Sequence, residues 1–201
     1  ARMLLESKNP LITVGIEVTK TGGQKKMIEL AELLSIPITQ GLSCFADFPN
    51  RHPLFLGMFS PYLTYTRDVD HYLVIGSQMP DLGSYVLQGP PPSKAKTVHI
   101  SLEPKLLAIS HPTELSIVAD ANEAISDLIE AIKSLATKER LNSIKKERYQ
   151  KIKNSAEGLR KKRIENAKKS WDKVPMTTER VSSDLNELLE DDAIIVTEPL
   201  T

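Results

Sequence analysis

The feature that most constrains the fold is the alternation of short apolar runs with helical patterns between Asn9 and Ile132. The runs are rich in Ile, Val and Leu without strict alternation, which predicts strands buried on both faces of a sheet. They cover residues 11–15, 36–40, 72–76, 97–102 and 115–118. Because strands that alternate with helices pair in parallel, the sequence predicts an α/β fold with a doubly wound, Rossmann-like parallel sheet of five to six strands.

Two helices follow from the sequence, one between two of these runs and one after the last of them. Residues 23–34 carry most of their apolar side chains on one side of a helix that stops before Pro37. Asp120 precedes Glu123 by three residues, a spacing typical of a helix N-terminus, and predicts a helix from there to Ile132. Both helices are expected to cover the sheet.

The composition is that of an ordinary globular protein. It has 40% apolar residues, and 26 basic and 26 acidic residues give a formal net charge of zero, so nothing global favours nucleic acid or an anionic membrane. There is no run of about 18 apolar residues, so no membrane-spanning helix is expected. The single cysteine, Cys44, excludes an internal disulfide and is predicted to be a small packed side chain. A reducing, cytoplasmic location is therefore expected.

The composition changes after Leu135. Residues 138–169 contain thirteen Lys or Arg against four Glu, and apolar side chains recur every three to five residues up to Trp171. This pattern predicts a long basic amphipathic helical connector that breaks near Gly158 and ends before Pro175. The basic face alone would suit nucleic acid, but the apolar stripe favours packing on a protein surface.

The last residues predict the entrance to a second domain. A helical pattern at 177–189 leads into an apolar strand at 193–197, and so short a strand cannot stabilise itself. We therefore expect the chain to be a piece of a larger protein, with a central α/β domain at 1–136, the connector at 137–175 and a truncated domain at 176–201.

Candidate ligand-binding residues stand near the ends of the predicted strands. They are Gly15, Gly22, Gly23, Gly76, Ser77, Glu103 and Asp120. The carboxyl ends of parallel strands share the edge at which open α/β folds bind ligands, so these residues form a candidate adenine-nucleotide site. Structural interpretations stay open, because the glycine spacing is not G-x-G-x-x-G and Glu103 before a proline could equally cap a helix.

No catalytic constellation is visible in the sequence. His52 and His111 precede prolines, His71 opens a predicted strand and His99 lies within one, so the histidines show no zinc-site spacing. There is also no G-x-S-x-G elbow and no phosphate-binding P-loop. The residues alone indicate a nucleotide-sized α/β module with no catalytic or metal-binding residue.

Six segments, taken in order, carry a resemblance to a known family. They are NPLITVG (9–15), LAELLSIPI (30–38), FPNRHPLFLG (48–57), DVDHYLVIG (68–76), VHISLEP (98–104) and IVAD (117–120). This order is similar to that in the central domain of the thiamine-diphosphate-dependent enzymes of the acetolactate synthase and 2-oxoacid decarboxylase group.

The resemblance implies a parent enzyme that needs thiamine diphosphate and magnesium, acts on a 2-oxo acid and forms a homodimer or homotetramer. It also implies that the magnesium and diphosphate ligands and the activating glutamate lie mostly outside this chain. Within the chain, Thr197 and Glu198 would approach the cofactor. The 201-residue piece alone is therefore predicted to be inactive.

Two departures from the family pattern bear on the central domain. Members that hold FAD carry an arginine-containing stretch where this chain has Ser77 to Asp81, and a glycine-rich segment where it has Met58 to Tyr62. These departures argue against FAD and leave ADP, a CoA tail or no ligand. Acetolactate-synthase-like carboligation, a benzoylformate-type decarboxylase, and a stand-alone nucleotide- or nucleic-acid-binding module remain the alternatives.

Overall fold

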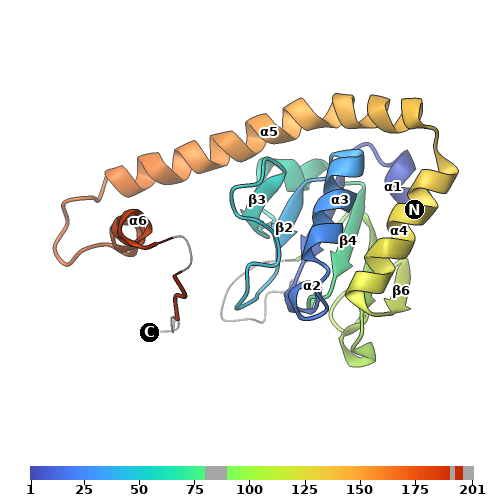
Figure 1. Cartoon of the computed structure of the whole chain (residues 1–201), viewed down its shortest axis with the longest axis horizontal. Coiled ribbons are helices and arrows are strands. Elements are labelled where there is room, and N and C mark those ends of the chain that lie inside the picture. The colour runs from blue at the N-terminus through green and yellow to red at the C-terminus, as the bar shows by residue number, and fades with distance from the viewer. Residues whose placement is uncertain (80–89, 191–192, 197–201) are drawn as a thin grey trace. The chain divides into compact units, whose positions relative to one another are not determined.

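The computed structural model describes residues 1–79, 90–190 and 193–196. The chain divides into two compact units, Ala1–Glu157 and Gly158–Thr201, and the first contains the whole sheet (Figure 1). The predicted residues Thr197 and Glu198 lie outside the described part, as does Asp81.

The core of the first unit is a sheet of six parallel strands in the order β3-β2-β1-β4-β5-β6. The strands are β1 (Pro10–Val14), β2 (Ile38–Gln40), β3 (Phe55–Met58), β4 (His71–Ile75), β5 (Lys96–Ser101) and β6 (Leu115–Val118). The order runs outward in both directions from β1 and β4, as a doubly wound sheet requires. The predicted fold class is confirmed.

The strands differ from the prediction in two respects. β3 was not predicted, because Gly57 interrupts its short apolar run, and the register with β2 shifts between Ile38 and Thr39. β6 was predicted to be buried on both faces, but Leu115 is 48% and Val118 57% exposed. That prediction was wrong because β6 is an edge strand, paired on one side with β5.

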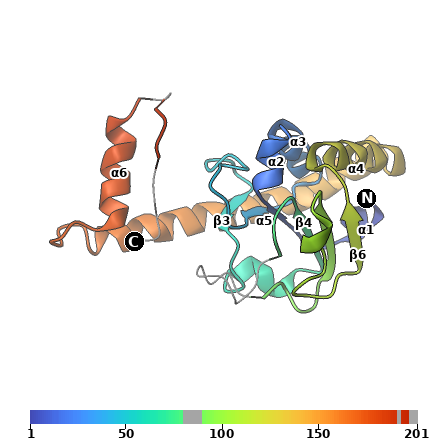
Figure 2. The ribbon, with the colours of Figure 1, turned by 90° about the horizontal axis from the view of Figure 1, so that it is seen from below.

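The predicted helices are present, with one difference in α5 that is described below. They are α1 (Arg2–Glu6), α2 (Ile16–Lys20), α3 (Gln24–Leu34), α4 (Ala121–Leu135), α5 (Lys138–Lys168) and α6 (Thr178–Leu188), with 3-10 turns η1 (Thr64–Asp68) and η2 (Pro104–Leu106). Asp120 caps α4, since its carboxylate accepts from the N–H groups of Asn122 and Glu123. Figure 2 shows α2, α3 and α4 on the same side of the sheet.

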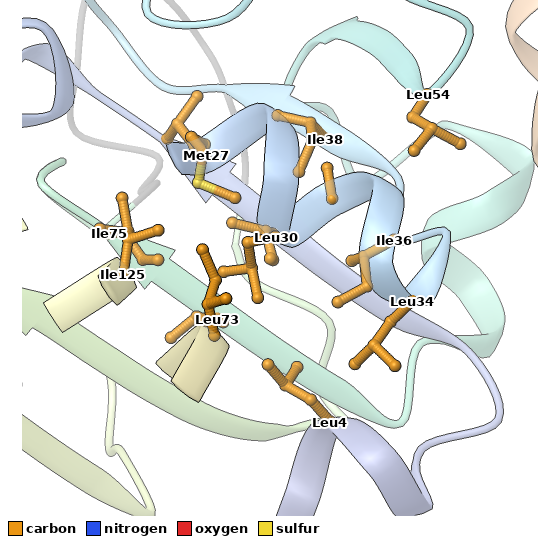
Figure 3. Close-up of a cluster of buried hydrophobic side chains, with 14 of the residues drawn as sticks. Leu4, Met27, Leu30, Leu34, Ile36, Ile38, Leu54, Leu73, Ile75 and Ile125 are labelled. Carbon is orange, nitrogen blue, oxygen red and sulfur yellow. The ribbon is translucent and has the colours of Figure 1, made fainter. Parts of the chain in front are cut away.

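Each face of the sheet has its own apolar cluster. Figure 3 shows the helical face, with side chains from Leu4, Met27, Leu30, Leu34, Ile36, Ile38, Leu54, Leu73, Ile75 and Ile125. The other cluster contains Leu11, Phe59, Val69, Tyr72, Val74 and Met79. On that second face the hydroxyl of Thr13 lies 2.8 Å from that of Thr39 and 2.7 Å from that of Tyr72, which satisfies three buried polar groups together.

Helix α5 is continuous through Gly158, so the predicted break there was wrong. A single glycine lowers helix stability by about 1 kcal/mol, which is not enough to end a helix of this length. In the first unit the predicted stripe is confirmed, because Leu141, Ile152 and Ala156 are buried in the domain.

Arg148 interrupts this apolar stripe and is itself only 8% exposed. Its Nη1 donates to the carbonyl of Leu34 at 3.2 Å, and its Nη2 donates to those of Leu4, at 3.4 Å, and Ser7. The guanidinium thus joins α5 to the carboxyl-terminal ends of α1 and α3, where helix dipoles favour a cation.

The second unit contains α6, whose first turn is capped by the hydroxyl of Thr177. Arg180 lies over the Trp171 ring at 5.4 Å and donates to its carbonyl. Residues 193–196, predicted as part of a strand, pair with no strand in the described structure, and Ile194 and Val196 are each 91% exposed. Because a strand needs a partner for its backbone groups, the strand stays a prediction.

We expect Arg148→Ala to lower the free energy of unfolding by about 2–4 kcal/mol, because it leaves three buried carbonyls without their donor. Urea denaturation of the 201-residue chain measures the change. Lys145→Ala on the exposed face of α5 is the matched control and should change stability by less than about 0.5 kcal/mol. Equal effects of the two substitutions would contradict the assigned role of Arg148.

Candidate functional site

The candidate site is the carboxyl edge of the sheet between β1 and β4, where the strand order reverses. Val14 and Ile75 end these two strands side by side. Ligands of open α/β folds bind at such a point, so the residues of the two following turns decide what this edge can hold.

The turns after β1 and β4 are packed against each other. The N–H of Gly15 donates to the carbonyl of Ile75 at 3.1 Å, and that of Glu17 donates to the carbonyl of Gly76 at 3.1 Å. A Cβ atom on Gly15 would lie 2.5 Å from that of Ser77. The structure therefore brings the predicted residues Gly15, Gly76 and Ser77 together, but their close contact leaves no space for a phosphate between them.

Both its backbone conformation and its surroundings favour glycine at position 76. Its φ is +62°, in the left-handed region, and a Cβ atom there would lie 2.7 Å from that of Glu17.

Glu17, which the sequence analysis did not single out, supplies the main charge at this edge. Its carboxylate accepts from the hydroxyl of Ser101 at 2.7 Å and from the N–H of Leu102 at 2.9 Å. Glu17 thus ties α2 to the end of β5. Because it places a negative charge beside the turn, the edge is unfavourable for a diphosphate.

The other predicted residues have structural partners of their own. Gly22 and Gly23 form the turn between α2 and α3, where Gly23 faces Asn122 and Ile125 of α4. Glu103 is exposed and pairs with Lys105 at 3.3 Å, and Asp120 caps α4.

The side chain of His99, in β5, is hydrogen-bonded to the turn after β4. Its Nε2–H donates to the carbonyl of Ser77 at 2.8 Å, and the ring is fully buried. Burial lowers the pKa of His99 below its ordinary value, while the bond to Ser77 and the charge of Glu17 act in the opposite direction. The neutral ring is therefore a fixed part of the packed edge.

A buried carboxylate lies in the loop after β2. Asp47 accepts from the hydroxyl of Thr19 at 2.6 Å, and its Oδ2 has no hydrogen-bond partner. In the same loop Cys44 is exposed, so its predicted packing was wrong.

Among the described residues no group of three His, Cys, Asp or Glu side chains could hold a metal ion. No helix within that part of the chain has the length and hydropathy to span a membrane. The residues of the edge do not fit a nucleotide diphosphate at the first turn. The N–H groups of Gly15 and Glu17 already donate to backbone carbonyls, Ser77 lies against Gly15, and the Glu17 carboxylate adds negative charge.

Comparison with known proteins agrees with this fold. Residues 1–128 match the family model of the thiamine pyrophosphate enzyme central domain. The chain is 29% identical over 145 residues to a probable acetolactate synthase large subunit of Methanocaldococcus jannaschii, covering 70% of this chain and 24% of that protein. It is 23% identical over 200 residues to the corresponding protein of Methanococcus aeolicus, covering 94% of this chain and 32% of that one.

A solved structure shows the same fold. It is a thiamine diphosphate-dependent 4-hydroxybenzoylformate decarboxylase of Rhodococcus jostii, with a TM-score of 0.57 and 23% identity over 66% of this chain and 26% of that one.

The α/β sheet and the family match together define the chain as a Rossmann-like domain of a cofactor-dependent enzyme. It belongs to the thiamine pyrophosphate enzyme family, as a central domain. The chain spans 24% and 32% of the two relatives that it matches.

We expect Gly15→Ala to lower the free energy of unfolding by about 1–3 kcal/mol, because the new methyl group meets Ser77 and the backbone of Gly76. Gly158→Ala is the matched control, since it adds the same methyl group within α5, where nothing lies within 4 Å. It should raise stability by about 0.5–1 kcal/mol through helix propensity. Urea denaturation compares the two, and a stable Gly15→Ala protein would show that the edge is more open than described.

Proposed function

We propose that this chain is the central domain, connector and first elements of the cofactor-binding domain of an enzyme that acts on 2-oxo acids. The proposed boundaries are 1–136, 137–175 and 176–201. The observation that carries the proposal is the match of residues 1–128 to the central-domain family model. The relatives named as acetolactate synthase large subunits favour carboligation after decarboxylation over decarboxylation alone.

Thiamine diphosphate, bound with magnesium, would supply the electron sink that this chemistry needs. Its ligands are proposed to lie mostly outside this chain, and within the chain Thr197 and Glu198 are the residues proposed to approach it. The proposal therefore gives the described residues a supporting role. We place the parent protein in the cytoplasm as a homodimer or homotetramer.

Within this enzyme we assign the central domain a structural function. Support comes from the carboxyl edge, where Gly15 contacts Ser77 and Glu17 occupies the end of β5. Adenine-nucleotide binding along Gly15, Gly22, Gly76, Glu103 and Asp120 is the second candidate, because the strand order places this edge at the usual ligand position.

The first test is activity. With pyruvate, thiamine diphosphate and magnesium, the 201-residue chain should show no turnover, whereas the full-length parent should form acetolactate. Release of acetaldehyde by the parent would favour the decarboxylase alternative. Turnover by the 201-residue chain would overturn its assignment as a supporting domain.

The second test is nucleotide binding. Calorimetry of the chain with ADP, FAD and CoA should give no saturable heat, because packed backbone and the Glu17 carboxylate occupy the edge. Saturable heat that is lost in Glu103→Gln would instead assign the second candidate. Lys105→Gln, at the ion-pair partner of Glu103, is the control for a change of surface charge.

A further inference from the structure

A cavity of about 370 Å³ lies at the opposite, amino edge of the sheet. It is lined by Lys8, Asn9, Tyr65, Glu147, Arg148 and Lys151, together with an apolar wall from Ile152. Its residues come from the segment before β1, from η1 and from the part of α5 in the first unit. The cavity is separate from the carboxyl edge, and its size lies within the ordinary range for small-molecule sites.

A buried cation forms one wall of this cavity. Arg148 is 8% exposed, yet it has no ion pair in the described part of the chain. Its three hydrogen bonds all go to carbonyl groups. A guanidinium has five N–H donors, so three bonds do not use all of its donor capacity, and its direct hydrogen-bond partners carry only partial charges.

Two nearby carboxylates, Asp70 and Glu147, act on the charge of Arg148 through space and favour its charged form. The hydrogen bonds of Asp70 go to other donors. Asp70 accepts from the hydroxyl of Ser7, from the N–H of Lys8 at 2.7 Å and from that of Asn9 at 3.1 Å. Burial raises the pKa of Asp70, but these hydrogen bonds outweigh it and hold the pKa at about 2. Asp70 therefore fixes the backbone that forms one rim of the cavity.

The rim adds further positive charge. Lys8 and Lys151 are exposed at the cavity and, with Arg148, give three cations against the single carboxylate of Glu147. Lys151 donates to the side-chain oxygen of Asn9 at 3.3 Å, which draws its ammonium group toward the segment before β1. The Tyr65 hydroxyl is already used, since it donates to the carbonyl of Pro10 at 3.0 Å.

We propose that this cavity is a binding site for a small oxyanion, a carboxylate or phosphate group held between Arg148, Lys8 and Lys151. The buried guanidinium gains an anion in direct contact, which no carboxylate among the described residues provides, and the two lysines complete the site from the rim. The bound anion links α5 to the segment before β1, so it stabilises the folded domain in proportion to its affinity. The proposal does not depend on the enzyme chemistry proposed above.

The test is thermal unfolding of the whole chain in increasing inorganic phosphate or malonate, with sodium chloride keeping the ionic strength constant. We expect a saturable rise of the melting temperature with one or both anions. A response to phosphate alone identifies a phosphate site, and a response to malonate identifies a carboxylate site. Lys8→Gln and Lys151→Gln should each weaken the apparent Kd about tenfold, which is the loss of one charge-assisted contact.

The matched control is Lys138→Gln, which removes the same charge from α5 away from the cavity and should bind the anion as the original chain does. No saturable rise with either anion up to about 50 mM, a range that covers weak sites, would overturn the proposal. An equal rise in all three variants would also overturn it, because the anion would then act through general charge screening.

Discussion

The parallel pairing of β1 with β4 is the interaction on which the rest of the structure depends. The two strands match over five residue pairs, and the sheet grows outward from them in both directions. Both faces of this pair are covered by apolar clusters, and the hydroxyl groups of Thr13 and Tyr72 satisfy each other within one of them. Because the strands end side by side, the turns that follow them must share the same space, and glycine at positions 15 and 76 makes that close approach sterically acceptable.

This constraint shapes what the domain can do. In an open α/β fold, the edge at the strand reversal is the usual place for a ligand. Here the amide of Gly15 and the amide of Glu17 donate to the turn after β4, and the Glu17 carboxylate covers the end of β5. The groups that could bind a diphosphate are thus used within the domain. An edge whose polar groups are used in this way agrees with the structural function that we propose for the domain.

Local patterns in the sequence were enough to predict the central strands, α3 and the Asp120 cap, because each of these features depends on neighbouring residues. β3 could not be predicted in this way, since its identity comes from pairing with β2 across a register shift. Glu17 was also missed, because its partners Ser101 and Leu102 are 84 and 85 residues away. From the local sequence, a carboxylate in a helix is predicted to be exposed to solvent. Only the tertiary fold places the end of β5 beside it.

The same reasoning explains why Arg148 was hidden in the basic run of α5. Among the thirteen Lys or Arg residues of positions 138–169, composition marks none as buried. The fold selects Arg148 because α1 and α3 both end beside it and present carbonyls that need donors. The two edges therefore differ: the Glu17 carboxylate lies at the closed carboxyl edge, whereas Arg148, Lys8 and Lys151 outnumber the one carboxylate, Glu147, that lines the cavity at the amino edge. A small anion is accordingly drawn to the amino edge, away from the position where the fold alone would lead one to look for it.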